Sequence, residues 1–120
     1  MFYIGRQLWI LISIISLSTL ILHNLPARAQ HIISVKIVPS GYLTFEFYSP
    51  STVSVTKGDT VTWTNNDKQV TSIMAYGKST LFDSGHLKPK TTFSYTFSEL
   101  GRFDYYCAIH PFMSGKVVVQ

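Results

Sequence analysis

The sequence predicts an all-β protein, a sandwich of seven or eight strands preceded by an N-terminal signal peptide. Short segments in which apolar and polar residues alternate recur throughout residues 30–120. Turn-forming residues separate these segments, and no part of this range has the apolar spacing of a convincing helix. Many short strands with turns between them are typical of two packed sheets.

Residues 1–29 have the pattern of a secretory signal peptide. Arg6 gives a short positive region, residues 9–22 are apolar except for serines and a threonine, and residues 27–29 read Ala-Arg-Ala. The alternative is an uncleaved membrane anchor, but the apolar run is shorter than the roughly 20 residues of a spanning helix. We expect cleavage after Ala29, export to the periplasm or an equivalent compartment, and no stable membrane association afterwards. The mature domain is then residues 30–120.

The first half of the mature domain holds four expected strands. Residues 43–48 alternate most clearly, with Leu43, Phe45 and Phe47 on one face, and residues 60–64 follow the same rule. The sequences Pro-Ser-Gly, Ser-Pro-Ser, Lys-Gly-Asp and Asn-Asn-Asp are typical turns. They end the expected strands at residues 32–38, 43–48, 53–55 and 60–64.

The second half continues the pattern. Short strands are expected at residues 71–76 and 81–82, on either side of Gly77. Residues 91–97 alternate again, and the last two strands are expected at residues 103–106 and 116–119. Large apolar side chains on strands are usually core residues. We expect this of Trp63, Phe93, Phe97 and Val118.

The segment of residues 105–113, Tyr-Tyr-Cys-Ala-Ile-His-Pro-Phe-Met, carries the most specific chemistry. Cys107 is the single cysteine of the chain, and His110 and Met113 follow at steps of three residues. A thiolate, an imidazole and a thioether form a soft ligand set that selects copper over magnesium, calcium or manganese. Pro111 excludes the interior of an ordinary helix. The spacing therefore predicts a loop between two strands that binds one metal ion.

Composition and charge exclude several other functions. One cysteine cannot form an internal disulfide, and metal ligation explains an unpaired thiol in an exported protein. The formal charge is +4, and without Arg6 and Arg28 eight basic and six acidic residues leave +2. The lysines are scattered, so we expect no nucleic-acid partner.

We also expect that the protein is not an enzyme. The sequence has no paired carboxylates in a motif, no glycine-rich phosphate loop and no Ser/His/Asp grouping. A nucleophile formed by Cys107 and His110 is the one alternative of this class. Metal binding explains these two residues better, because Met113 lies on the same loop.

Three stretches resemble the small blue-copper proteins, the cupredoxins of the amicyanin and plastocyanin type. They are Gly-Asp-Thr-Val-Thr-Trp-Thr-Asn-Asn-Asp at residues 58–67, Phe-Asp-Ser-Gly at residues 82–85, and residues 101–119. The resemblance implies a Greek-key sandwich, one type 1 copper ion and electron carriage outside the cytoplasm. It also implies that Cys107 is the thiolate ligand, His110 the imidazole at the solvent edge and Met113 the weak axial ligand.

The sequence departs from this family at one ligand. Cupredoxins have a second histidine a few residues after the Asn-Asn-Asp turn, and the usual spacing leads here to Thr71. A threonine hydroxyl is a poor copper ligand. The missing ligand is then His86 as a replacement, water or an external ligand. His31 is expected to be a surface residue.

Three functions remain in order of preference. The first is an exported copper protein that carries single electrons, is monomeric, and docks a redox partner near Pro111 and Phe112. The second is Cu(I) binding for delivery, storage or sensing by an incomplete type 1 site. The third is a metal-free interaction module on the same fold.

Overall fold

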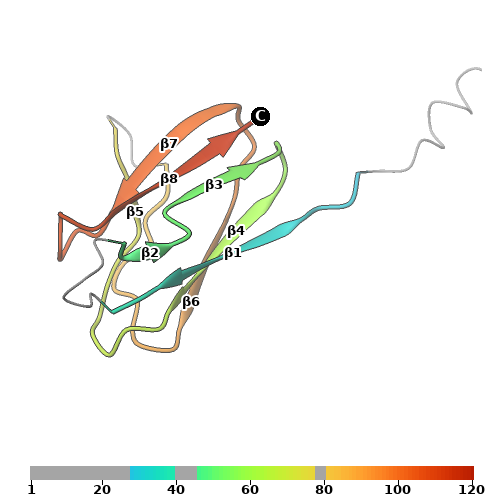
Figure 1. Cartoon of the computed structure of the whole chain (residues 1–120). Coiled ribbons are helices and arrows are strands. Elements are labelled where there is room, and N and C mark those ends of the chain that lie inside the picture. The colour runs from blue at the N-terminus through green and yellow to red at the C-terminus, as the bar shows by residue number, and fades with distance from the viewer. Residues whose placement is uncertain (1–27, 40–45, 78–80) are drawn as a thin grey trace, which may run out of the picture.

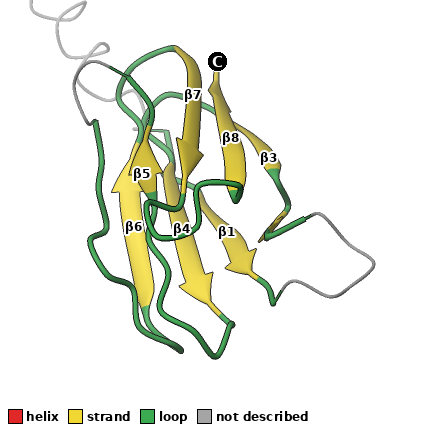
Figure 2. Ribbon diagram, turned by 90° about the vertical axis from the view of Figure 1, so that its left-hand side faces the viewer, coloured by secondary structure: helices red, strands yellow, loops and turns green. Residues whose placement is uncertain are grey.

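The structure is a computed structural model, and it describes residues 28–39, 46–77 and 81–120. Eight strands form two four-stranded sheets that pack face to face, with no helix in these ranges (Figures 1 and 2). The predicted all-β sandwich is therefore confirmed. The predicted signal peptide lies almost wholly outside the described residues. In the part that is described, no helix is long and apolar enough to cross a membrane.

The first sheet has the strand order β2-β1-β4-β6. Its strands are β1 (Ile32–Ile37), β2 (Tyr48–Ser49), β4 (Thr60–Asn65) and β6 (Thr92–Thr96). β1 and β4 run parallel, and β6 pairs with β4 in the antiparallel sense. β4 is thus a central strand, and its buried residues alternate with half-buried ones, as its sequence predicts.

The second sheet has the order β3-β8-β7-β5. Its strands are β3 (Thr52–Val55), β5 (Met74–Ala75), β7 (Gly101–Tyr106) and β8 (Ser114–Val119). From β2 to β7, every connection along the chain crosses from one sheet to the other. β7 and β8 are an antiparallel pair, so the loop of residues 107–113 leaves one strand and enters its neighbour.

Three expected strands are shorter than predicted or absent. Residues 43–45 of the strand expected at 43–48 are outside the described ranges, and of the described residues 46–48 only Tyr48 lies in a strand. The strand expected at 71–76 is reduced to β5, and residues 81–82 form none. Instead, single bridges join Thr71 to Leu87 and Met74 to Asp83. Residues 71–73 are all buried and do not alternate, and each of these partner segments pairs through one residue pair.

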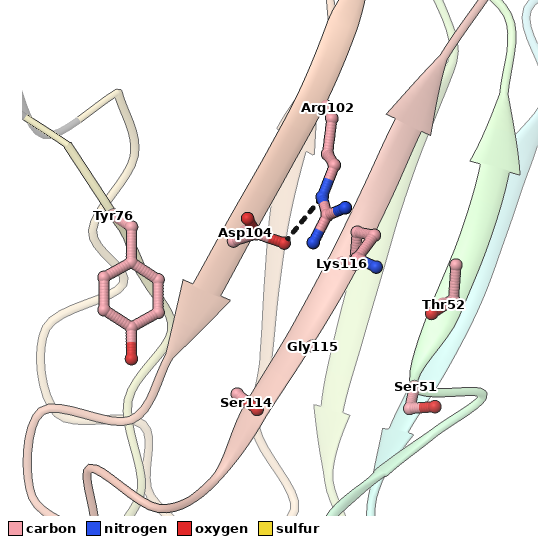
Figure 3. Close-up of a pocket in the computed structure, with 8 residues that line it drawn as sticks. All are labelled: Ser51, Thr52, Tyr76, Arg102, Asp104, Ser114, Gly115 and Lys116. Atoms are coloured by element: carbon pink, nitrogen blue, oxygen red, sulfur yellow. Dashed lines mark hydrogen bonds and ion pairs between the residues drawn. The ribbon is translucent and has the colours of Figure 1, made fainter.

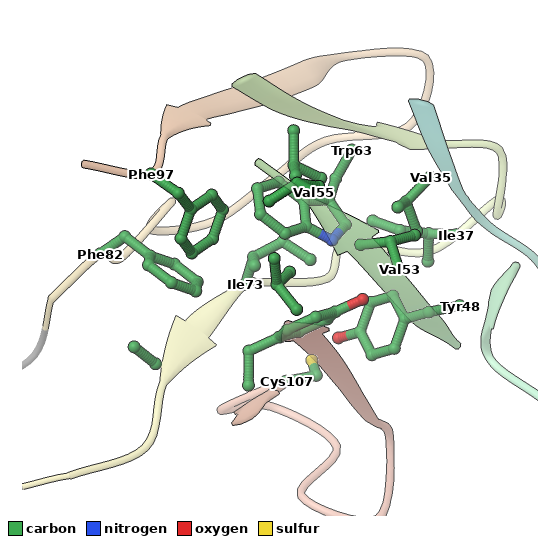
Figure 4. Packing of buried hydrophobic residues seen from close by; sticks show 14 of the residues in the cluster. Val35, Ile37, Tyr48, Val53, Val55, Trp63, Ile73, Phe82, Phe97 and Cys107 are labelled. Carbon is green, nitrogen blue, oxygen red and sulfur yellow. The ribbon is translucent and has the colours of Figure 1, made fainter. Parts of the chain in front are cut away.

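The core lies between the sheets and is centred on Trp63, which has no exposed surface (Figure 4). Its ring stacks on Phe82 and Phe93 with centroid distances of 5.7 and 5.8 Å, and it meets Tyr105 edge-on at 5.3 Å. Such aromatic pairs add about 0.5–1.5 kcal/mol each beyond the burial of their area. Figure 4 places Cys107 at the margin of this cluster, next to Tyr48.

The expected core is confirmed except at one position. Trp63 and Phe97 are buried, and Phe93 is half-buried against the core. The expectation for Val118 is wrong: it is half-buried on the other face of its strand, while Val117 and Val119 face the core. Side chains alternate along a strand, so the pairing register decides which face receives each valine.

Candidate metal centre

Backbone hydrogen bonds connect the three candidate ligands of the loop of residues 107–113. The Cys107 backbone N–H donates to the Met113 carbonyl at 3.1 Å, and the Met113 N–H donates to the His110 carbonyl at 2.9 Å. These bonds close the loop at the point where β7 ends and β8 begins. The backbone therefore ties Cys107, His110 and Met113 together, as their sequence spacing predicted.

The His110 ring lies close to the Cys107 sulfur. Cys107 is buried, and its Sγ lies 4.0 Å from Nδ1 of the half-buried His110. Ligands bonded to one metal ion at about 2.0–2.3 Å are at most about 4.3 Å apart, so this spacing is compatible with a shared ion. Met113 is buried and, like His110, lines the cleft described below. The donor set of one thiolate, one imidazole and one thioether fits copper.

The segment of residues 71–72 also contacts the sulfur. The Thr71 hydroxyl donates to Cys107 Sγ at 3.3 Å, and the Ser72 hydroxyl does so at 3.7 Å. Both residues are buried. Thr71, the position that counting along the sequence reached, thus contacts the thiol. Ser72 was missed, and its place next to Thr71 is the one signal that marks it.

These hydrogen bonds change the acidity of the thiol. Burial raises the pKa of Cys107, but hydrogen bonds from the Thr71 hydroxyl, the His110 backbone amide and Ser72 outweigh it. They lower the pKa from its ordinary value to about 7. Hydrogen bonds to the charged form of an acid favour that form. The site thus holds the thiol close to the state in which it binds metals.

The solvent-facing side of the loop is apolar. Phe112 is 67% exposed, and Ile109 and Pro111 are exposed on the same loop. The Phe112 ring packs edge-on against Phe47, with a centroid distance of 5.2 Å. A cleft of about 220 Å³ opens here. It is lined by Pro39, Phe47, Asp67, Gln69, His110, Phe112 and Met113.

A larger groove lies away from the candidate ligands. It has a volume of about 440 Å³ and runs over the outer face of β3, β7 and β8, as Figure 3 shows. Its lining includes Lys116 and the ion pair between Arg102 and Asp104, whose Nε–Oδ1 distance is 3.2 Å. This polar surface contains none of the candidate ligands. The smaller cleft, in contrast, is lined by two of the three candidate ligands, His110 and Met113.

The remaining two histidines of the mature domain are on the surface. His86 is exposed and directly precedes Leu87, whose backbone pairs with Thr71. His31 is exposed near Asp59, at the start of β1. Among the described residues, no three His, Cys, Asp or Glu side chains group together as a metal site. The candidate set falls outside this grouping because its third donor is a thioether.

Known proteins resemble this chain in sequence. A family profile described as a cupredoxin-like domain matches residues 10–119. Amicyanin from Paracoccus denitrificans is 38% identical over 77 residues, which cover 61% of this chain and 58% of that protein. Amicyanin from Paracoccus versutus is 34% identical over 101 residues, or 81% of this chain and 69% of that protein. The chain thus spans less than two thirds of the first relative.

The structural comparison agrees with the sequence comparison. A purple cupredoxin from Nitrosopumilus maritimus superposes with a TM-score of 0.66 and 34% identity, covering 73% of this chain and 99% of that chain. An amicyanin variant in its oxidised form superposes with a TM-score of 0.62 and 33% identity, covering 73% and 81%. The chain therefore belongs to the cupredoxin family, whose cofactor is copper.

Proposed function

We propose that the protein is an exported carrier of single electrons, with one copper ion held by Cys107, His110 and Met113. The observation that carries this proposal is the closed loop of residues 107–113. It brings Cys107 Sγ within 4.0 Å of His110 Nδ1 and binds both residues to Met113 through the backbone. Copper supplies the chemistry, since it accepts and releases one electron.

The strands around the loop limit how far the ligands move. β7 and β8 pair along six residues each, from Gly101 to Val119, and hold the two ends of the loop together. Protein interiors are densely packed and resist deformation. Ligands that stay in place in both oxidation states reduce the rearrangement that accompanies electron transfer. The half-buried His110 ring links the sulfur to the surface.

The exposed apolar surface of Ile109, Pro111 and Phe112 is the proposed docking surface for a redox protein. It surrounds His110, and the His110 and Phe112 ring centroids are 5.9 Å apart. Electron-transfer complexes bury little area, typically below about 1,200 Å². A small apolar surface next to the exit of the electron suits such a short-lived contact. We propose that the protein acts as a monomer.

One observation favours a second function, Cu(I) binding for delivery or sensing. Thr71 takes the place of the second imidazole, and its hydroxyl contacts the sulfur at 3.3 Å. The site then offers two soft sulfur ligands and one imidazole, a set well suited to Cu(I). His86 is exposed, and it would have to turn towards Cys107 to restore the second imidazole.

A copper titration with redox cycling tests these proposals. The mature protein, residues 30–120, is mixed with Cu(II), and its visible spectrum is recorded before and after ascorbate and ferricyanide. An electron carrier gives an intense sulfur-to-copper band that disappears on reduction and returns on oxidation. Binding of Cu(I) alone supports delivery or sensing. Failure to bind either ion would leave the metal-free interaction module.

Export is a separate proposal with its own measurement. The chain carries an apolar run followed by Ala27-Arg28-Ala29, which predicts cleavage after Ala29. Intact mass spectrometry of the protein recovered from the periplasm should give a chain that begins at Gln30. A mass that includes residues 1–29 would indicate a membrane anchor instead.

A further inference from the structure

We infer that Thr71 sets the oxidation-state preference of the copper site, because its hydroxyl bonds to the Cys107 sulfur and thereby favours Cu(I) over Cu(II). The inference rests on the proposed binding of copper by Cys107. It assigns Thr71 a role as a positioning residue, which acts on the metal through the sulfur. Thr71 is therefore more than a position at which a ligand is absent.

The Thr71 hydroxyl is held in place by the fold. The Thr71 N–H donates to the Leu87 carbonyl at 3.0 Å, and the Leu87 N–H donates back to the Thr71 carbonyl at 2.8 Å. Thr71 is 2% exposed, so water does not compete freely for its hydroxyl. Its hydrogen bond to Cys107 Sγ, at 3.3 Å, is thus part of the buried structure. A hydroxyl directed at the sulfur also argues against a freely open, water-filled ligand position.

Ser72 fixes the same segment from its other side. Its hydroxyl accepts a hydrogen bond from the Ala108 N–H at 2.8 Å, and its carbonyl accepts one from the Tyr48 hydroxyl at 3.2 Å. The Ser72 hydroxyl also lies 3.7 Å from Cys107 Sγ. The segment of residues 71–72 is therefore bound both to the ligand loop and to the core, so that the two hydroxyls stay directed at the sulfur.

The charge on the sulfur explains why this contact distinguishes the two oxidation states. A thiolate bound to Cu(II) donates much of its negative charge to the metal. Bound to Cu(I), it keeps more of that charge. A hydrogen bond to a charged group is stronger than one to a neutral group, and a buried site strengthens it further. The Thr71 hydroxyl therefore stabilises the Cu(I) form more than the Cu(II) form.

The test compares three variants of the mature protein. Thr71→Val removes the hydroxyl and keeps the branched shape, whereas Thr71→Ser keeps the hydroxyl. Thr52→Val is the matched control, because Thr52 is an exposed threonine on β3. The dissociation constants for Cu(I) and Cu(II) are measured separately, by competition with a chelator for each ion. The reduction potential of the bound copper is measured at an electrode, which supplies the single electron.

Thr71→Val should lower the ratio of Cu(I) affinity to Cu(II) affinity about tenfold, the effect of one hydrogen bond to a charged group. For a one-electron couple, this change equals a reduction potential lower by about 59 mV. Thr71→Ser and Thr52→Val should leave both quantities close to those of the parent. The copper–sulfur stretching frequency of the Cu(II) form should rise in Thr71→Val, because the sulfur then donates more charge to the metal.

The outcomes separate this inference from the function on which it rests. An unchanged ratio and potential in Thr71→Val, with copper still bound, would overturn the role of Thr71 and leave the copper carrier intact. A parent protein that binds copper in neither state would overturn both. Circular dichroism shows whether Thr71→Val is folded, and if it is not, Thr71→Ala takes its place with the same expected fall in the ratio.

Discussion

The loop of residues 107–113 and the segment of residues 71–72 meet at the Cys107 sulfur, but they bring different chemistry to it. The loop brings an imidazole and a thioether, both of which bind copper. The segment brings two hydroxyls, which hydrogen-bond to the sulfur at 3.3 and 3.7 Å. In our proposal, metal ligation and adjustment of the sulfur therefore come from separate parts of one fold.

Replacing the sulfur removes the point at which the two segments meet, so it has the largest expected effect. Cys107→Ser should abolish the sulfur-to-copper absorption and reduce Cu(I) affinity beyond detection, because the only thiolate is lost. The fold should persist, since serine has nearly the same size. Visible absorption and far-UV circular dichroism measure these two effects. A variant that still shows the intense band would exclude Cys107 as the ligand.

Gly115 is the second residue of β8, directly after the strand's first residue, Ser114. A Cβ atom at this position would lie 2.2 Å from the Tyr105 ring, and Tyr105 is fully buried. Overfilling a packed core costs about 1–3 kcal/mol. Gly115→Ala should lower the free energy of unfolding by about this amount in urea denaturation of the copper-free protein. Unchanged stability would mean that Tyr105 moves aside easily.

The exposed surface of the loop can be changed without touching the sulfur. Phe112→Asp should slow electron transfer to the redox partner about tenfold, which corresponds to about 1.4 kcal/mol of docking free energy. The copper spectrum should stay the same. Leu100→Asp is the matched control, because Leu100 is also 67% exposed and lies beyond the far end of β7. Stopped-flow rates that fall equally in both variants would exclude the loop as the main contact.

The smallest effect is expected from Asp59, which lies at the end of the sandwich away from Cys107. The Thr56 backbone amide lowers the pKa of the Asp59 carboxyl most, burial opposes it, and the His31 amide adds to the lowering. Arg28 lowers it further in the full chain only, because the proposed cleavage after Ala29 removes that residue. A carboxyl with a lowered folded-state pKa stabilises the fold above its unfolded pKa of about 3.9. This contribution is lost as the pH falls through the lower, folded-state pKa.

Asp59→Asn should therefore be less stable than the parent at neutral pH, and the difference should shrink in acid. Thermal unfolding of the copper-free protein between neutral pH and pH 2 measures it. The copper spectrum should not respond, because Asp59 precedes β4 at the end away from Cys107. A difference in stability that does not vary with pH would mean that the Asp59 charge plays no part.

Much of the fold follows from alternation along the chain. Most strands that alternate clearly, such as β4 and β6, lie where the sequence places them. Val118 was assigned to the wrong face because the register that pairs Val117 with Phe103 and with Val53 is set by other strands. Periodicity within one segment contains no information about that register.

The candidate site was predictable only where its residues are close together in the sequence. Cys107, His110 and Met113 are close in sequence, so their spacing alone indicated a metal loop. The contact between Thr71 and Cys107 joins residues 36 positions apart. Counting from the Asn-Asn-Asp turn placed Thr71 at the site, but only the folded chain shows that its hydroxyl meets the sulfur.

The most direct test of this account is the visible spectrum with Cu(II), compared among the parent, Thr71→His and His86→Ala. We predict a sulfur-to-copper band in the parent, tighter Cu(II) retention in Thr71→His, and no change in His86→Ala. These results would show that Thr71 occupies a ligand position that an imidazole can fill. A spectrum that changes in His86→Ala but not in Thr71→His would contradict the account, since His86 would then be the fourth ligand.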